Sequence, residues 1–217
     1  MTGEAKAVTA IGIVTLLIIV GGVLISNNMG KTASSNTPVQ KVDSNLLIRD
    51  DSNKISTDSA KVTLVEFGDF QCPACAAYHP EVKKIINSNK DKLNFVFRNF
   101  PLSQHQNALV AAEAAEAAGE QGKYWEMYDI LYEKQNDWAE SRKPLDLFSQ
   151  YAKDIKLDVE KFKKAVNENK FSDKINKDKT DGTALGVTST PTFYINSEKF
   201  SGSPDDLETR INVELKK

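Results

Sequence analysis

One strand–helix–strand pattern in the sequence constrains the fold more than any other feature. The run KVTLVEF, residues 61–67, is rich in β-branched side chains and is typical of a buried strand. The motif CPAC follows, and Pro73 suits the first turn of a helix, which we expect to extend to about Asn87. The run LNFVF, residues 93–97, predicts a second buried strand. Strand, helix and strand in this order predict a parallel, right-handed βαβ unit and therefore an α/β fold.

The sequence after the second strand is mostly helical. The Ala-rich stretch NALVAAEAAEAAGEQ predicts a helix that stops at Gly119, and apolar residues then recur at helical spacing from Trp125 to Val166. The run TFYIN, residues 192–196, returns to a strand, KFSG predicts a last short strand, and PDDLETRINVELKK predicts a C-terminal helix. Before the βαβ unit, LLIR at 46–49 predicts a short edge strand.

The N-terminal region differs in composition from the rest of the chain. Residues 8–25 are 18 consecutive residues without a charge, which is long enough to span a bilayer. No A-x-A cleavage pattern follows, so we expect an uncleaved transmembrane anchor over 1–25. Residues 26–45 contain no aromatic residue and are dominated by Ser, Asn, Thr and Lys, which predicts a flexible tether. The folded domain is then expected over 46–217.

The charge of the chain narrows the possible partners. The net charge is −2, and no strongly basic block occurs in the sequence. This balance argues against nucleic acid as a partner. The many Lys and Glu residues are therefore interpreted as a solvated surface of mixed charge.

Both cysteines of the chain, Cys72 and Cys75, lie in the CPAC motif. A structural zinc site usually needs four ligands, and the two histidines, His79 and His105, do not complete a zinc-finger spacing. Covalent haem attachment needs His directly after the second Cys, where this chain has Ala76. A permanent disulfide across so short a loop would constrain the unfolded chain little. The pair is therefore predicted to be a redox dithiol, with no metal and no cofactor.

The position of the pair at a helix start predicts different roles for the two thiols. Cys72 would face unpaired N–H groups and the positive end of the helix dipole, which lowers the pKa of a thiol. Cys75 lies one turn deeper, where it can resolve a mixed disulfide. Glu66 interrupts an apolar run. It either faces solvent at a strand end or lies beneath the helix start and exchanges a proton with Cys75. Asp69 either shares that task or is a loop residue.

The segment TSTPTFYIN supplies a third candidate part of the site. Pro191 cannot join a central ladder, so it marks the entrance of the following strand. A cis bond between Thr190 and Pro191 would be a feature that the fold enforces. The carbonyl and N–H groups of Thr190 are then expected to pair with a substrate backbone beside Cys72. We interpret both histidines, His79 and His105, as helix-surface or packing residues.

Together these motifs resemble membrane-anchored DsbA-like thiol–disulfide oxidoreductases of the thioredoxin superfamily. VTLVEFGDFQCPAC is similar to the strand, acid and CPxC motif of that family, RNFPLSQHQNALVAAEAA to the segment that leads into its helical insertion, and GVTSTPTFYIN to its cis-Pro strand. The resemblance implies a thioredoxin-like fold with a helical domain inserted at about 104–185. It also implies a role for each candidate residue: nucleophile for Cys72, resolving thiol for Cys75, buried acid for Glu66, and substrate-binding loop for Thr190 and Pro191.

The resemblance further implies an activity and a location. A dithiol oxidant works outside the reducing cytosol. We therefore expect a monomeric, single-pass membrane protein whose catalytic domain oxidises cysteine-containing translocated proteins on the extracytoplasmic side. A membrane quinone-linked thiol oxidase would reoxidise it. Two alternatives stay open, namely a disulfide reductase or isomerase fed from the membrane, and a non-enzymatic metal-binding or holdase module. One departure bears on this choice, because Ala74 stands where the strongest oxidants of the family have His.

Overall fold

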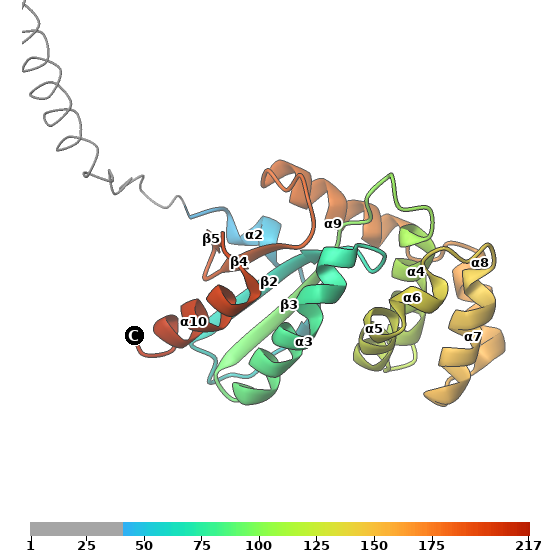
Figure 1. Ribbon diagram of the computed structural model, residues 1–217, viewed down its shortest axis with the longest axis horizontal. Coiled ribbons are helices and arrows are strands. Elements are labelled where there is room, and N and C mark those ends of the chain that lie inside the picture. Colours follow the sequence, from blue (N-terminus) through green and yellow to red (C-terminus); the bar gives the residue numbers. More distant parts are fainter. Residues whose placement is uncertain (1–40) are drawn as a thin grey trace, which may run out of the picture. The chain divides into compact units, whose positions relative to one another are not determined.

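The βαβ unit predicted from the sequence lies at the centre of the sheet (Figure 1). In the computed structural model, which describes residues 41–217, strand β2 (Val62–Gly68) pairs in parallel with β3 (Leu93–Asn99). Helix α3 (Pro73–Ser88) connects the two strands, as expected, and ends one residue beyond the predicted limit. The parallel pairing confirms the α/β prediction.

Three shorter strands complete a five-stranded sheet in the order β1-β3-β2-β4-β5. β1 (Asn53–Ile55) pairs with β3, β4 (Thr192–Ile195) pairs with β2, and β5 (Glu198–Lys199) pairs with β4, all of them antiparallel. The strand predicted at TFYIN is thus confirmed, whereas the last short strand overlaps the predicted run KFSG only at Lys199. The β4 pairing places the start of that strand beside the end of β2, close to where α3 begins.

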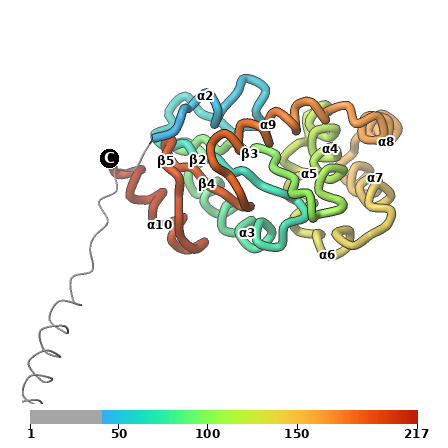
Figure 2. The backbone as a smooth tube through the Cα atoms, turned by 90° about the horizontal axis from the view of Figure 1, so that it is seen from above, coloured from blue at the N-terminus to red at the C-terminus, as the bar shows by residue number. Residues whose placement is uncertain are grey.

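Helices cover both faces of the sheet, as the view from above shows (Figure 2). One face carries α3 and the C-terminal helix α10 (Pro204–Glu214), which contact each other. The opposite face carries α2 (Ser44–Leu47) and α9 (Ser172–Ala184). Successive side chains of a strand point to opposite faces. In β2, Leu64 therefore packs in the larger core beneath α3, and Phe67 packs in the smaller core beneath α9.

The helical block predicted from the sequence gathers beside the sheet (Figure 1). Its central helix is Ala-rich, and its alanines are buried on almost every side, which is typical of a helix surrounded by others. Large aromatic side chains from the surrounding helices fill the space around it. The block comprises α4 (Ala108–Gly119), α5 (Tyr124–Glu133), α6 (Gln135–Trp138), α7 (Pro144–Asp154) and α8 (Val159–Asn167).

The N-terminal part of the described chain corrects one prediction. The edge strand expected at 46–49 is wrong, because Ser44–Leu47 forms α2. The side chain of Asp43 accepts a hydrogen bond from the backbone N–H of Asn45 and caps this helix, and Leu47 is buried in the smaller core. The anchor predicted at 1–25 lies outside the described residues. No helix within 41–217 is both long enough and apolar enough to cross a bilayer.

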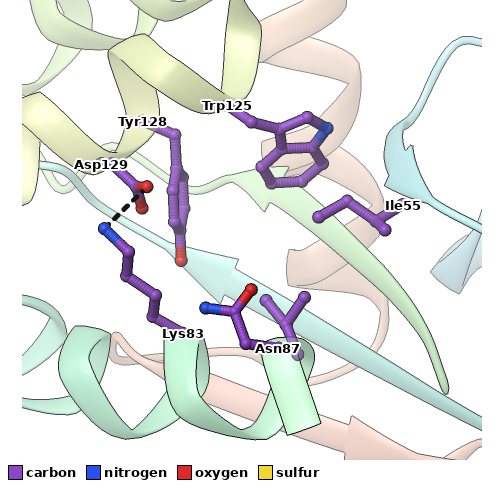
Figure 3. A pocket seen from close by; sticks show the side chains of 7 residues that line it. Ile55, Lys83, Asn87, Trp125, Tyr128 and Asp129 are labelled. Carbon is purple, nitrogen blue, oxygen red and sulfur yellow. Dashed lines mark ion pairs between the residues drawn. The ribbon is translucent and has the colours of Figure 1, made fainter. Parts of the chain in front are cut away.

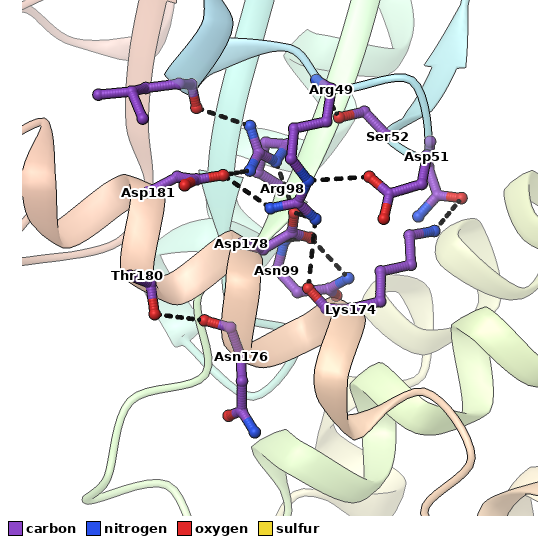
Figure 4. Close-up of polar contacts among 12 residues, drawn as sticks. Arg49, Asp51, Ser52, Arg98, Asn99, Lys174, Asn176, Asp178, Thr180 and Asp181 are labelled. Carbon is purple, nitrogen blue, oxygen red and sulfur yellow. Dashed lines mark hydrogen bonds and ion pairs between the residues drawn. The ribbon is translucent and has the colours of Figure 1, made fainter.

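A buried ion network fastens α2 and α9 to the sheet (Figure 4). Arg98 of β3 is fully buried and lies 2.6 Å from Asp178 and 2.5 Å from Asp181, both on α9. Its guanidinium also donates to the carbonyl oxygens of Leu46 and Leu47, which a helix of four residues leaves unpaired. Arg49 makes ion pairs with the same two carboxylates. The network pairs the buried charges of Arg98 and Asp178 and joins segments that lie far apart in the sequence.

Candidate active site

The two cysteines occupy different environments at the start of α3. Cys72 is the N-cap residue, Pro73 follows at the first helical position, and 7% of Cys72 is exposed. Cys75 is one turn further along the helix and is fully buried. Both are free thiols in this structure. Both cysteines are buried, and Cys72, predicted to be the exposed member of the pair, is the less buried of the two.

The surroundings of Cys72 stabilise its thiolate. Its pKa is lowered to about 5, first of all by the hydrogen bond that the Cys75 thiol donates to it. Thr190 and the backbone N–H groups of Ala74 and Cys75 lower the pKa further, while burial opposes them. These N–H groups belong to the first turn of α3, which has no intrahelical acceptor for them. The sequence-based expectation of a low pKa at the helix start is consistent with this geometry.

The opposite shift affects Cys75. Its pKa is raised well above its ordinary value of 9.0, mainly by burial. Donating a hydrogen bond to Cys72 and lying near the negative charge of Glu66 both raise it further. One thiol of the pair is therefore ionised at neutral pH, and the other holds its proton.

The loop before β4 faces the cysteine pair. The peptide bond between Thr190 and Pro191 is cis. The carbonyl oxygen of Thr190 accepts a hydrogen bond from the Cys72 thiol at a distance of 3.3 Å, which favours the protonated thiol. The Thr190 hydroxyl is buried and has no hydrogen-bond partner among the described residues, so it is free to donate to the Cys72 thiolate. Thr190 thus contacts Cys72 in either protonation state.

Glu66 is buried beneath the helix start, and 1% of it is exposed. The alternative that it faces solvent is therefore wrong. Strand alternation places it on the α3 face of β2 together with Leu64. The pKa of Glu66 is raised to about 8, mainly by burial. The hydrogen bond from the Tyr128 hydroxyl, 3.3 Å away, lowers this pKa, and the negative charge of Cys72 raises it. A carboxyl group with this pKa can both give and take a proton near neutral pH.

Asp69 holds the loop that leads to the cysteines. One carboxylate oxygen accepts from the N–H of Gln71, and the other accepts from the N–H of Leu102 and lies 2.7 Å from Nδ1 of His105. The carboxylate is thus engaged on both oxygens, which supports the loop interpretation of Asp69. His105 lies in the loop before α4 and not on a helix, so that part of the prediction is wrong.

His79 lies one turn after Cys75 and is a packing residue, as predicted. Its ring packs at a tilt against the rings of Tyr128 and Tyr132, with centroid distances of 5.4 and 5.2 Å. Its Nε2 atom lies 2.8 Å from a carboxylate oxygen of Asp129. Within residues 41–217, no three His, Cys, Asp or Glu side chains gather as possible metal ligands.

Two residues of the helical block complete the site, and sequence reasoning missed both. Gln135 donates to the carbonyl oxygens of Phe70 and Cys72 and so holds the CPAC loop against α6. Tyr128 is the hydrogen-bond partner of Glu66. Tyr128 lies 62 positions from Glu66 and Gln135 lies 65 positions from Phe70, and both belong to an aromatic stretch whose spacing indicates core packing. No local signal distinguishes them from their neighbours.

Comparison with known proteins identifies the family. The thioredoxin family model matches residues 53–213. The chain is 34% identical over 170 residues to the probable disulfide bond formation protein D of Bacillus cereus, a match that covers 75% of this chain and 78% of that protein. It is also 38% identical over 145 residues to the Na(+)/H(+) antiporter NhaA 1 of Salinispora arenicola. That match covers 66% of this chain but only 21% of the antiporter. The chain thus spans about a fifth of the length of the first curated relatives it matches.

Solved structures give the same result. BdbD from Bacillus subtilis, in its oxidised form, superposes with a TM-score of 0.68 at 27% identity, covering 76% of this chain and 94% of BdbD. The α-DsbA1 protein of Wolbachia pipientis superposes with a TM-score of 0.65 at 25% identity, covering 79% and 92% of the two chains. The chain therefore belongs to the thioredoxin family and is similar to its DsbA-like members.

Proposed function

We propose that this protein oxidises dithiols of translocated proteins through the pair Cys72 and Cys75. One observation carries the proposal, which is the opposite displacement of the two thiol pKa values. A thiolate that is stable at Cys72 stabilises the reduced pair, and a stable reduced pair makes the disulfide a stronger oxidant. The resemblance to disulfide bond formation proteins also supports electron flow from the substrate dithiol to the cysteine pair.

The oxidation consists of two thiol–disulfide exchanges. A substrate thiolate attacks the Sγ atom of Cys72, the Cys72–Cys75 bond breaks, and Cys75 leaves as a thiolate that takes a proton from Glu66. A second substrate thiolate then attacks the substrate sulfur of the mixed disulfide, and Cys72 leaves as a thiolate. The substrate has lost two electrons and gained a disulfide, and the enzyme pair is reduced. The low pKa of Cys72 favours its departure in the second step.

Thr190 and Pro191 are assigned to binding of the substrate backbone. The Thr190 carbonyl oxygen already lies 3.3 Å from Cys72, so a chain segment paired with this loop would run past the reacting sulfur. A cis-Pro loop that presents backbone groups beside a nucleophile can align an extended peptide by strand-like hydrogen bonds. Such alignment would hold the substrate cysteine near Cys72.

The rest of the assignment concerns location and partners. We assign residues 1–25 to a single-pass membrane anchor, 26–45 to a tether and 46–217 to a monomeric DsbA-like domain outside the cytoplasmic membrane. The uncharged stretch over 8–25 and the polar stretch after it support this arrangement. Each turnover leaves the pair reduced, so a membrane quinone-linked thiol oxidase is the proposed electron acceptor.

A second function, reduction or isomerisation of disulfides, is favoured by one observation. Ala74 occupies the position next to Cys75 and offers the Cys72 thiolate only its backbone N–H. A side-chain donor there would lower the pKa of Cys72 further and make the pair more oxidising. The reduction potential separates the two functions.

Trapping of mixed disulfides tests the roles of the cysteines. Cys75→Ala leaves the Cys72 thiolate able to attack disulfide-bearing proteins but removes the thiol that would release them. We expect disulfide-linked adducts of Cys75→Ala on non-reducing gels of the native host and none of Cys72→Ala. Equal adducts from both variants would contradict the assignment.

A further inference from the structure

We propose that Tyr128 and the cavity between α3 and α5 form the route by which protons travel between Glu66 and solvent. Tyr128 is then a positioning residue for the thiol chemistry, since it acts through Glu66. The proposal rests on the proposed function of Glu66 as proton donor and acceptor for Cys75.

The chemistry requires Glu66 to exchange its proton with solvent in each cycle. After Glu66 has protonated Cys75 in the oxidation of a substrate, the Cys72 thiolate nearby favours a new proton on Glu66. When Cys72 next enters a mixed disulfide with the reoxidising partner, that negative charge is gone. Glu66 must then release its proton before it can take the proton of Cys75. A buried carboxyl group can do this only through a relay.

The active-site surface offers poor access to Glu66. Cys75 is fully buried above it, and the exposed part of Cys72 is small. Within the described residues, the hydroxyl of Tyr128 is the one side-chain group that hydrogen-bonds to the Glu66 carboxylate. The relay from Glu66 therefore begins at Tyr128.

Tyr128 also lines a cavity between α3 and α5. The cavity has a volume of about 200 Å³ and is lined by Tyr128 together with residues of β1, α3 and α5. In Figure 3 the hydroxyl end of Tyr128 points toward α3, which contributes Lys83 and Asn87 to the lining. A water molecule occupies about 30 Å³ in the liquid, so the cavity has room for several.

The lining provides the polar partners that water needs. Asn87 is exposed, and Lys83 forms an ion pair with Asp129 at a distance of 2.9 Å where both side chains are partly exposed. Three polar side chains, Lys83, Asn87 and Asp129, thus line the same cavity as Tyr128 and reach bulk solvent. Trp125 and Ile55 form the apolar wall opposite. A chain of waters bound to such groups conducts protons between a buried acid and the surface.

The hydroxyl relays the proton without forming a tyrosinate. Burial raises the pKa of Tyr128 well above its ordinary value of 10.0, and the negative charges of Glu66 and Asp129 raise it further. The ionisable groups that face it are Glu66 on β2, Cys75 and His79 on α3, and Tyr124, Asp129 and Tyr132 on α5. A hydroxyl group can donate one hydrogen bond and accept another at the same time. Tyr128 therefore passes a proton to Glu66 while it receives one from water.

The test follows the second half of the cycle in the full-length chain. Cys72 is loaded with glutathione from glutathione disulfide, and glutathione release by Cys75 is measured in a single turnover across pH. We expect Tyr128→Phe to lower the plateau rate by roughly tenfold or more. Tyr124→Phe is the matched control, because Tyr124 lies one turn earlier on α5 and its buried hydroxyl has no partner among the described residues. Its profile should equal that of the unmodified protein.

Several results would overturn the relay. A pH profile of Tyr128→Phe that moves to higher pH with an unchanged plateau would mean that Tyr128 only adjusts the pKa of Glu66. An unchanged profile, or an equal loss in Tyr124→Phe, would also contradict it. Asn87→Leu makes the exposed lining apolar without touching Glu66 or Tyr128, and it should slow release in a folded protein. An unchanged rate there would exclude the cavity as the route.

Glu66→Gln separates failure of the relay from failure of the proposed function. If Glu66→Gln slows glutathione release and Tyr128→Phe does not, the relay is wrong and the role of Glu66 stands. If Glu66→Gln releases glutathione at the unmodified rate, the proposed role of Glu66 fails, and the relay fails with it.

Discussion

Cys72 and Cys75 lie one helical turn apart, yet they differ in protonation because different groups surround them. Cys72 receives hydrogen bonds from the Cys75 thiol and from backbone N–H groups at the helix start, whereas Cys75 is enclosed by apolar side chains and negative charge. The difference gives the pair one nucleophile and one proton reservoir. Which sulfur reacts is thus decided by position on α3 and not by the chemistry of cysteine itself.

This difference predicts the pH dependence of alkylation. In the reduced protein, Cys72 should react with iodoacetamide at a rate that is half-maximal near about pH 5 and constant above about pH 7. Cys75 should stay unmodified until the pH exceeds 9, because its pKa is raised well above 9.0. Mass spectrometry of the quenched protein assigns the labelled residue. Labelling of Cys75 before Cys72 at neutral pH would contradict the account.

Glu66 predicts a cost in stability that depends on pH. Its pKa is about 8 in the folded protein and 4.5 ordinarily, so folding disfavours the charged form. The free energy of unfolding should therefore fall as the pH rises from 4.5 to 8, by about 1.4 kcal/mol per pH unit relative to Glu66→Gln. Urea unfolding of both reduced proteins across this range measures the difference. A difference that does not change with pH would show that Glu66 is not buried as an acid.

At the scale of elements, α9 depends on the ion network more than on apolar packing. Its sequence SDKINKDKTDGTA contains few apolar residues, and Asp178 is buried against Arg98. Asp178→Ala would leave Arg98 buried without the more deeply buried of its two carboxylate partners, which should destabilise the protein by about 3–5 kcal/mol. Asp173→Ala, an exposed substitution in the first turn of the same helix, should cost about 1 kcal/mol or less.

Thermal or urea unfolding of these two variants gives the comparison. Equal effects would mean that the network contributes no more to stability than a surface charge does.

The close packing of α9 against the sheet also depends on a glycine, because a Cβ atom at Gly182 would come within 2.8 Å of the Phe100 ring. Gly182 is therefore required in spite of its low helix propensity.

The elements that the sequence predicts correctly are those with a local signal. β2, α3 and β3 have strong apolar patterns and a Pro at the helix start, and the Ala-rich helix ends at Gly119 as expected. The strand prediction at 46–49 is wrong because a short apolar run does not distinguish a strand from a helix. The segment forms a helix because Asp43 caps it and Arg98, 51 positions away from Leu47, binds its carbonyl oxygens.

The same distinction applies to the site. The motif CPAC at a helix start places Cys72 and Cys75 from the sequence alone, whereas the interrupted apolar run leaves two positions open for Glu66. Tyr128 and Gln135 cannot be placed in this way, because their contacts with β2 and the CPAC loop depend on how the helical block packs beside the sheet. Their roles become visible only in the folded chain.

At the scale of the whole molecule, the state of the cysteine pair should change stability in an unusual direction. A disulfide usually stabilises a fold. Here the reduced form gains the interactions of the Cys72 thiolate, so we expect the reduced protein to unfold at a higher temperature than the oxidised one. The pKa of Cys72 is lowered from 9.0 to about 5, so this gain is complete above pH 9 and is lost as the pH falls toward 5.

Calorimetry with and without reductant, at pH 5 and at pH 8, measures this dependence. The advantage of the reduced form should be larger at pH 8 than at pH 5. An oxidised form that is more stable at both pH values would indicate a reductase, because a stable disulfide is a weak oxidant.

The central claim is that the fold makes the Cys72–Cys75 disulfide oxidising, and its reduction potential tests this most directly. Thioredoxin has a nucleophile pKa of about 7 and a potential of about −270 mV, and DsbA has about 3.5 and about −120 mV. The pKa of Cys72, about 5, lies between these limits, and Ala74 contributes no side-chain donor. Equilibration with glutathione should therefore give a potential of about −180 to −120 mV. A potential near about −270 mV would contradict the oxidase function and favour the reductase.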